Sequence, residues 1–234
     1  MRIDARSLGL FRIGLALALL GDLLQRWDWI DAFYSNDGVL PNHNHLFNLR
    51  DSGQVWSIYH SFSSVDENQF AFALNLIFYL FFLFGLHTRV FHVLSLVCLV
   101  SLTGRNVLLD SYGNSVAIAL CAITALLPLG SAFSIDSLRA SMAARQELTP
   151  DDLNDRSSPK HIRVPASLAA LVTMLMLGGI LLFAGLQQTG QTWGDSTALY
   201  YALHVDRWAS GAGVAVRDAL PAGALGVWTK LLRI

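Results

Sequence analysis

Apolar residues along this chain gather into five long runs that are separated by polar segments. A helix needs about 20 mostly apolar residues to cross the hydrocarbon core of a bilayer. The runs lie at about residues 7–24, 70–86, 90–109, 112–129 and 164–186. The third has the least certain end, because Arg105 interrupts it. Backbone groups in lipid must pair within the protein, so the pattern predicts an all-α, polytopic transmembrane helical bundle.

Two segments outside these runs are polar but rich in aromatic residues, at about residues 27–69 and 193–220. Amphipathic rings collect at the headgroup layer of a membrane, so we expect short interfacial helices in both. In the second segment, residues 194–196 suit a helix start. Apolar residues then recur at helical spacing, at Ala198, Tyr201, Ala202, Val205 and Trp208. Residues 146–159 form a polar linker.

Composition supports a membrane protein and narrows the chemistry. The chain is 53% apolar and 14% charged, whereas soluble domains are about 25% charged. A net charge of −1 gives no indication of nucleic-acid binding. Cys98 and Cys121 lie in apolar runs without a CxxC motif, which is typical of buried thiols. His43 and His45 form an HxH pair, which supplies too few ligands for a structural zinc, so no metal site is predicted.

Lysine and arginine positions predict the orientation, because short cytoplasmic loops carry an excess of them. Basic residues precede the first run and the fifth, and Arg89 lies in the tight turn between the second and third. This distribution favours a cytoplasmic N-terminus, with residues 27–69 outside. Arg12 interrupts the first apolar run and no small-x-small cleavage site follows, so that run is a retained helix and not a signal peptide.

Two arginines inside the predicted bundle are candidate functional residues. A charge at the centre of a membrane costs about 2.5–3.5 kcal/mol on insertion scales. Arg12 therefore either has a function or binds a buried structural partner, or its side chain extends (snorkels) to the cytoplasmic surface. Arg105 lies near Asn106, Asp110 and Asn114. It could bind an anionic group or a quinone oxygen, or it could pair with Asp110 and close a loop. His204 is a further candidate.

Several segments, in this order, resemble the HTTM (horizontally transferred transmembrane domain) family, which includes the vitamin K-dependent γ-glutamyl carboxylases. The resemblance covers essentially all of residues 1–234. It rests on residues 3–6, 10–14, 33–41, 85–89, 101–106, 127–130, 133–136, 184–193 and 198–203, including Gly85-Leu86-His87-Thr88-Arg89 and Leu127-Pro128-Leu129-Gly130. The resemblance implies a helical bundle with an outward-facing site, and it suggests a bacterial cytoplasmic membrane.

The chain departs from the carboxylases at the decisive position. The resemblance of this chain to the carboxylases implies a lysine base with a lowered pKa, which deprotonates vitamin K hydroquinone. That lysine falls on Gln188 here, whose amide is not a base near neutral pH. The stretch at residues 112–114 also lacks the family's histidine, and residues 1–234 do not include the large luminal substrate domain of the carboxylases. The sequence ends at Ile234 without a clear structural stop, so we expect it to be truncated at the C-terminus.

Two interpretations follow. The first is a non-carboxylating membrane protein that assists maturation or export of a partner peptide. The second is an enzyme that uses a quinone or hydroquinone. In the second, Arg105, Tyr200 or His204 would replace the lysine at the Gln188 position. Arg12, Asn114 and Trp193 would be the candidate cofactor-binding residues. The residues alone assign no cofactor, and the only partner they predict is the lipid bilayer.

Overall fold

The computed structural model describes residues 2–43, 47, 56–106, 109, 112–146, 163–165, 168–204 and 211–232. These residues are almost entirely helical. Two strands of three residues, β1 (Arg2–Asp4) and β2 (Arg163–Pro165), pair antiparallel near the N-terminus. The chain divides into two compact units, Met1–Thr173 and Met174–Ile234. The prediction of an all-α helical bundle is confirmed.

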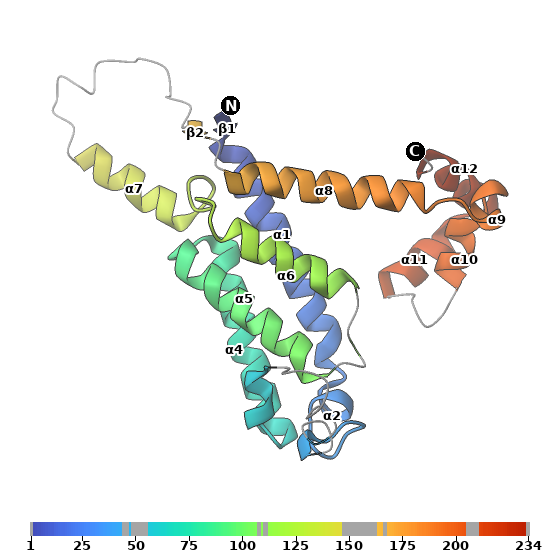
Figure 1. The fold of residues 1–234 in the computed structure, drawn as a ribbon, viewed down its shortest axis with the longest axis horizontal. Coiled ribbons are helices and arrows are strands. Elements are labelled where there is room, and N and C mark those ends of the chain that lie inside the picture. Colours follow the sequence, from blue (N-terminus) through green and yellow to red (C-terminus); the bar gives the residue numbers. More distant parts are fainter. Residues whose placement is uncertain are drawn as a thin grey trace. The chain divides into compact units, whose positions relative to one another are not determined.

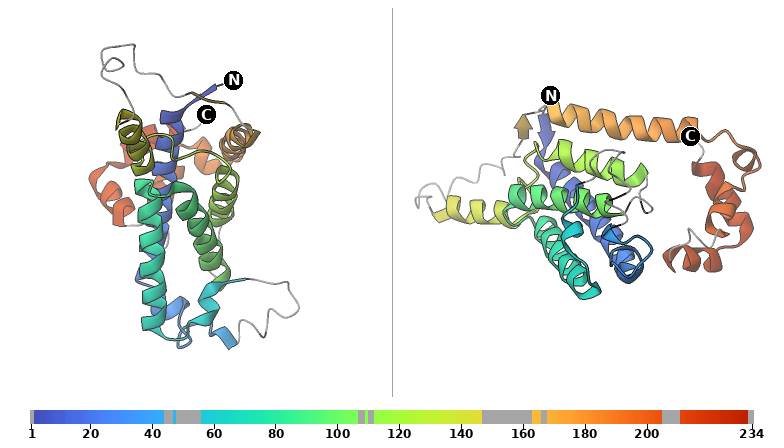
Figure 2. Two further views of the ribbon diagram at one scale, coloured as in Figure 1. Left: turned by 90° about the vertical axis from the view of Figure 1, so that its left-hand side faces the viewer. Right: turned by 60° about the horizontal axis from the view of Figure 1, so that its bottom comes forward.

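The first unit is built on helices α1 (Ala5–Trp27), α4 (Val65–Phe84), α5 (Thr88–Arg105) and α6 (Tyr112–Thr124). Each lies beside the next in the order α1, α4, α5, α6, as Figure 1 and Figure 2 show. The buried face of α1 carries residues at helical spacing. These and their partners on α4 and α5 form the core: Leu8, Leu15, Leu19, Leu23, Phe72, Phe82, Leu99 and Leu102.

Four helices within the described ranges are long and apolar enough to cross a membrane: α1, α4, α5 and α8 (Leu168–Leu186). They fit an integral membrane protein. The run at residues 112–129 differs from the prediction, because its helix α6 has 13 residues. At 1.5 Å per residue this is about 20 Å, shorter than the hydrocarbon core. The chain leaves the helix at Thr124 and turns before Pro128, which cannot continue a helix.

Two further boundaries differ from those predicted. Helix α4 begins five residues before the apolar run, at Val65. A capping box explains this start, since Ser64 accepts from the Glu67 backbone and Glu67 accepts from the Ser64 backbone. Helix α1 continues past the predicted end to Trp27, through Asp22 and Arg26. These two charged side chains pair with each other across one turn, so the helix retains them.

The segment between α1 and α4 contains the short helices α2 (Ile30–Phe33) and η2 (Ile58–Ser61). Short helices were predicted here, and the described part contains them. Ser57 and Ile58 fasten η2 to α5. The Ser57 hydroxyl donates to the Ser101 carbonyl at 2.6 Å, and the Ile58 backbone donates to Ser101 Oγ at 2.7 Å. Tyr34 and Tyr59 are buried instead of facing the headgroup layer. His45 lies outside the described residues.

After α6 comes helix α7 (Ile135–Gln146), which sequence analysis did not predict. The polar linker predicted at residues 146–159 lies outside the described residues from 147 onward. Helix α8 follows, and most of its apolar side chains are exposed, including Leu175, Leu181 and Phe183. Such exposure along a span of 19 residues is expected of a helix that faces lipid.

The second unit holds most of α8, and its described residues form the short helices α9 (Gln191–Gly194), α10 (Ala198–His204), α11 (Gly211–Ala219) and α12 (Ala222–Leu232). Helix α10 packs on α11 and α12. The Leu199 backbone donates to Thr229 Oγ1 at 3.3 Å, where α10 meets α12. A helix is present from Ala198 to His204, where sequence predicted one, and the later residues of that prediction, Val205 and Trp208, lie outside the described part.

Candidate functional site

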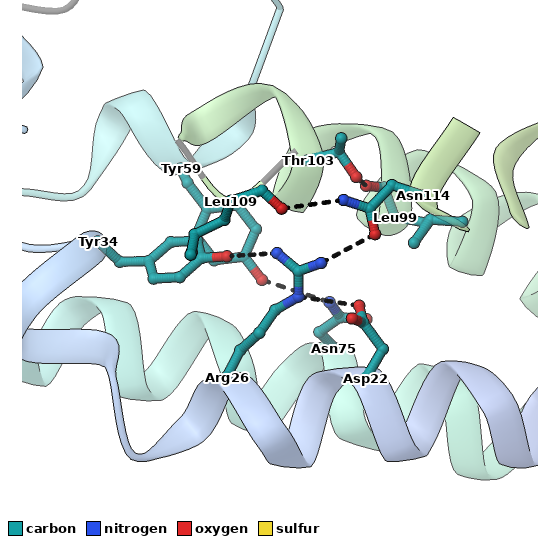
Figure 3. Close-up of polar contacts among 9 residues, drawn as sticks. All are labelled: Asp22, Arg26, Tyr34, Tyr59, Asn75, Leu99, Thr103, Leu109 and Asn114. Carbon is teal, nitrogen blue, oxygen red and sulfur yellow. Dashed lines mark hydrogen bonds and ion pairs between the residues drawn. The ribbon is translucent and has the colours of Figure 1, made fainter. Parts of the chain in front are cut away.

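A polar cluster surrounds Arg26 at the end of α1 (Figure 3). Its guanidinium donates to Asp22 Oδ2 at 2.9 Å, to the Tyr34 hydroxyl at 3.2 Å and to Asn114 Oδ1 at 3.0 Å. The Asn114 amide nitrogen in turn donates to the Leu109 carbonyl at 3.3 Å. The cluster therefore joins α1, the residue after α2, and α6 through one mostly buried cation. Every guanidinium nitrogen of Arg26 has a protein partner.

Aromatic rings continue this cluster into the core. The rings of Tyr34 and Tyr59 each meet Phe72 edge-on, at centroid distances of 4.9 and 5.5 Å. Asn75 Nδ2 donates to the Tyr59 hydroxyl at 3.4 Å. Burial raises the pKa of the Tyr34 phenol, and the nearby Arg26 guanidinium offsets only part of that rise. Burial raises the pKa of Tyr59 as well. Both phenols therefore stay neutral near pH 7, and neither can serve as a base.

Arg105 holds the loop after α2 to the end of α5. Its side chain is fully buried, and its terminal nitrogens donate to the carbonyls of Leu40 at 3.1 Å and Tyr34 at 3.0 Å. The neighbouring Asn106 donates to the Phe33 carbonyl at 2.9 Å. These contacts hold a different loop from the one that a pair of Arg105 with Asp110 would close. Asp110, the expected ionic partner, lies outside the described residues.

Arg12 lies at the opposite end of the bundle and is also fully buried. It donates to the Leu129 carbonyl at 3.3 Å and to the Phe133 carbonyl at 2.7 Å, which lie in the turn between α6 and α7. Of the alternatives the sequence left open, the structure shows a buried partner and not snorkelling. Gly85 allows the close approach: its φ is +67°, and a Cβ there would lie 2.4 Å from Arg12 Nη1.

Asp136 binds the residues at the start of α5 and so connects α5 to the turn that holds Arg12. Its carboxylate accepts from the His87 backbone at 2.9 Å, the Thr88 backbone at 2.7 Å and the Thr88 hydroxyl at 2.8 Å. Burial acts to raise the pKa of Asp136, but these hydrogen bonds outweigh it and lower the pKa below its ordinary value. A carboxylate at a helix N-terminus is stabilised by the unpaired backbone N–H groups there.

The remaining candidates lie in the second unit. Tyr200 and His204 come together one turn apart on α10. Their rings stack with centroids 4.0 Å apart, and His204 Nδ1 lies 2.8 Å from the Tyr200 carbonyl. Gln188 is half-buried, and its Oε1 has no hydrogen-bond partner among the described residues. Trp193 lies on α9 and is half-buried. No hydrogen bond or ring contact in the described part links Gln188 to Tyr200 or His204.

Within the first unit, the structure places the predicted site residues apart from one another. Arg12 and Arg105 lie at opposite ends of a bundle whose helix α5 is about 27 Å long, at 1.5 Å per residue. Asn114 belongs to the Arg26 cluster, which was not predicted because Arg26 lies beyond the predicted end of the first run at about residue 24. The spacing of Asp22 and Arg26, four residues apart, was the available signal. In the described part, no group of three or more His, Cys, Asp or Glu residues is placed to hold a metal ion.

Comparisons of the chain with protein families, with curated proteins and with solved structures each give no match. The resemblance to the HTTM family therefore stays a prediction that rests on the quoted residues.

Proposed function

We propose that this chain is a non-carboxylating, multi-pass membrane protein of the HTTM type that assists maturation or export of a partner peptide. One observation carries the proposal. The terminal guanidinium nitrogens of Arg12, Arg26 and Arg105 are all occupied by oxygen atoms of the protein itself. A charge that is buried with such partners stabilises a scaffold, because each of its terminal nitrogens already binds an oxygen of the protein itself.

The segments that carry the resemblance support this view, because they contact one another at two places: around Arg12 and Asp136, and around Arg105. Residues 85–89 and 133–136 contact each other through Asp136, and residues 127–130 accept a hydrogen bond from Arg12. Residues 33–41 and 101–106 meet through Arg105. A shared scaffold alone therefore accounts for these segments, without a shared reaction.

The position expected to hold a catalytic base supports the same conclusion. Gln188 has an amide there, and an amide cannot take a proton from a hydroquinone near neutral pH. An amide side chain can both donate and accept hydrogen bonds, which suits recognition of a peptide more than proton transfer. We place the protein in a bacterial cytoplasmic membrane with its N-terminus inside, so that the Gln188 end of α8 faces outward.

The test is deletion of the gene in its own host, followed by mass spectrometry of the secreted peptides. The proposal expects one peptide to disappear or to accumulate unprocessed. Wild-type protein and a Gln188→Leu variant serve as a matched pair in complementation. Wild type should restore the peptide, and Gln188→Leu should not, because leucine is similar in size but can neither donate nor accept a hydrogen bond. Unchanged secreted peptides in the deletion strain would refute the proposal.

One observation favours the alternative, an enzyme that uses a quinone or hydroquinone. His204 Nδ1 donates to the Tyr200 carbonyl, which leaves Nε2 as the ring atom able to accept a proton. His204 is exposed, so a substrate can reach it. Oxygen consumption by purified protein supplied with a hydroquinone tests this function. Turnover that a His204→Gln variant loses would support the enzyme, and equal background rates in both would exclude this residue as its base.

A further inference from the structure

A small cavity opens at the side of the bundle, between α4, α5 and the segment around η2. Its volume is about 110 Å³, and its walls are mostly apolar. The residues around its mouth, Ile58, Phe70 and Leu74, are 43%, 69% and 42% exposed, so the cavity opens on the surface of the first unit. Because α4 and α5 are both long and apolar enough to cross a membrane, this surface faces the lipid.

One polar group in the cavity wall is unsatisfied. Asn75 lines the cavity and is only 1% exposed. Its Nδ2 donates to the Tyr59 hydroxyl, but its Oδ1 has no donor within hydrogen-bonding distance among the described residues. A buried acceptor without a donor costs about 1–3 kcal/mol. A ligand that supplies one donor at this point would remove that cost.

We propose that this cavity binds the hydroxyl end of a neutral aliphatic lipid, whose hydroxyl group donates to Asn75 Oδ1. Asp, Glu, Lys, Arg and His are all absent from its lining, so nothing there would stabilise a charged headgroup. The volume is somewhat smaller than the ~150 Å³ apolar cavity that holds benzene. It therefore admits a hydroxyl and its first few carbons, while the rest of the chain lies along Phe70 and Leu74.

Cys98 offers a direct readout, because it lines the cavity and is partly exposed. The other cysteine, Cys121, is fully buried and does not line the cavity. The full chain in detergent is treated with N-ethylmaleimide, and alkylation at Cys98 is followed by peptide mass mapping. The probes are 1-decanol and its methyl ether, which has the same tail and no donor, together with decane and decanoate.

The proposal expects 1-decanol to slow alkylation of Cys98 at concentrations where the other probes have little effect. One hydrogen bond corresponds to a preference of roughly 3- to 10-fold for the alcohol over the ether. Equal protection by the alcohol and the ether would overturn the proposal, and this comparison needs no variant. Stronger protection by decanoate would overturn the neutral character of the ligand. If no probe protects Cys98, water alone fills the cavity and the proposal fails.

A pair of variants assigns the preference to one atom. Asn75→Leu keeps the size of the side chain and removes the acceptor, so the alcohol and the ether should then protect Cys98 equally. Asn68→Leu is the matched control, since Asn68 lies two turns earlier on the same helix, is equally buried and does not line the cavity. It should keep the preference for the alcohol. Persistence of the preference in Asn75→Leu would contradict the assignment.

Discussion

Replacement of Arg12 by leucine tests whether a membrane arginine acts as a structural brace. In the folded protein, its two terminal nitrogens bind the carbonyls of Leu129 and Phe133. Leucine offers no donor, so both carbonyls lose their partner in the turn that leads to α7. The change also removes a buried positive charge, whose guanidinium Nε has no partner among the described residues. The two effects oppose each other.

The loss of the carbonyl partners should be the larger effect. The contact with Leu129 is buried, and a buried carbonyl left unpaired costs about 1–3 kcal/mol. The contact with Phe133 is partly buried, so water can replace it and the net loss is about 0.5–1.5 kcal/mol. Relief of the buried charge recovers part of this sum. We expect Arg12→Leu to lower the free energy of unfolding by about 2–3 kcal/mol.

A thermal melt in detergent, followed by fluorescence-detected gel filtration, measures this effect. For a chain of this size, 1 kcal/mol shifts Tm by about 2–4 °C, so Tm should fall by roughly 4–12 °C. Arg6→Leu is the matched control, because Arg6 is on the same helix, is exposed and should change Tm little. An Arg12→Leu melt that coincides with wild type would refute the brace.

Three other predictions follow from the same structure. A reporter fused after Gln146 should behave as cytoplasmic and one inserted after Asn42 as external, and the reverse labelling would overturn the orientation. Purified protein should not carboxylate a Glu-rich peptide with vitamin K hydroquinone and labelled bicarbonate, because Gln188 is no base. Incorporation by the unmodified protein would show that another group serves. The pKa of Asp136 is lowered by folding, so its contribution to stability is full above its ordinary pKa and is lost as pH falls through the lowered value. Acid melts of wild type and Asp136→Asn should therefore converge at low pH, and a constant difference in Tm would exclude this role.

The helices were largely predictable, since apolar runs of this length have few alternatives in lipid. The errors concerned the ends of two helices, where hydropathy alone was used to set the boundary. The first span was ended at about residue 24, before Arg26, although the pairing of Arg26 with Asp22 lets the helix continue. Pro128 was included in a span, although the chain leaves the helix at Thr124 before it. Local pairing and backbone restriction, which hydropathy does not include, explain both errors.

The site was much less predictable, because its contacts are distant in sequence and use the backbone. Arg12 binds carbonyls 117 and 121 residues away. Every residue has a backbone carbonyl, so the residue types at those positions do not indicate that a contact forms there. For Arg105 the sequence suggested a carboxylate five residues away, while the structure supplies the carbonyls of Leu40 and Tyr34. Sequence identified the costly charges correctly and could not name their acceptors.

The brace at Arg12 also dictates an order of events during synthesis. A ribosome that adds about 5–20 residues per second needs roughly 6–24 s to go from Arg12 to Phe133. Throughout that interval, the Arg12 guanidinium lacks at least the Phe133 carbonyl that it binds in the folded protein. The first helix therefore reaches its final place only after the turn that follows α6 has been made. A chain that stalls before Phe133 presents a bare charge in an apolar helix, a mark by which membrane proteases can recognise an unfinished protein.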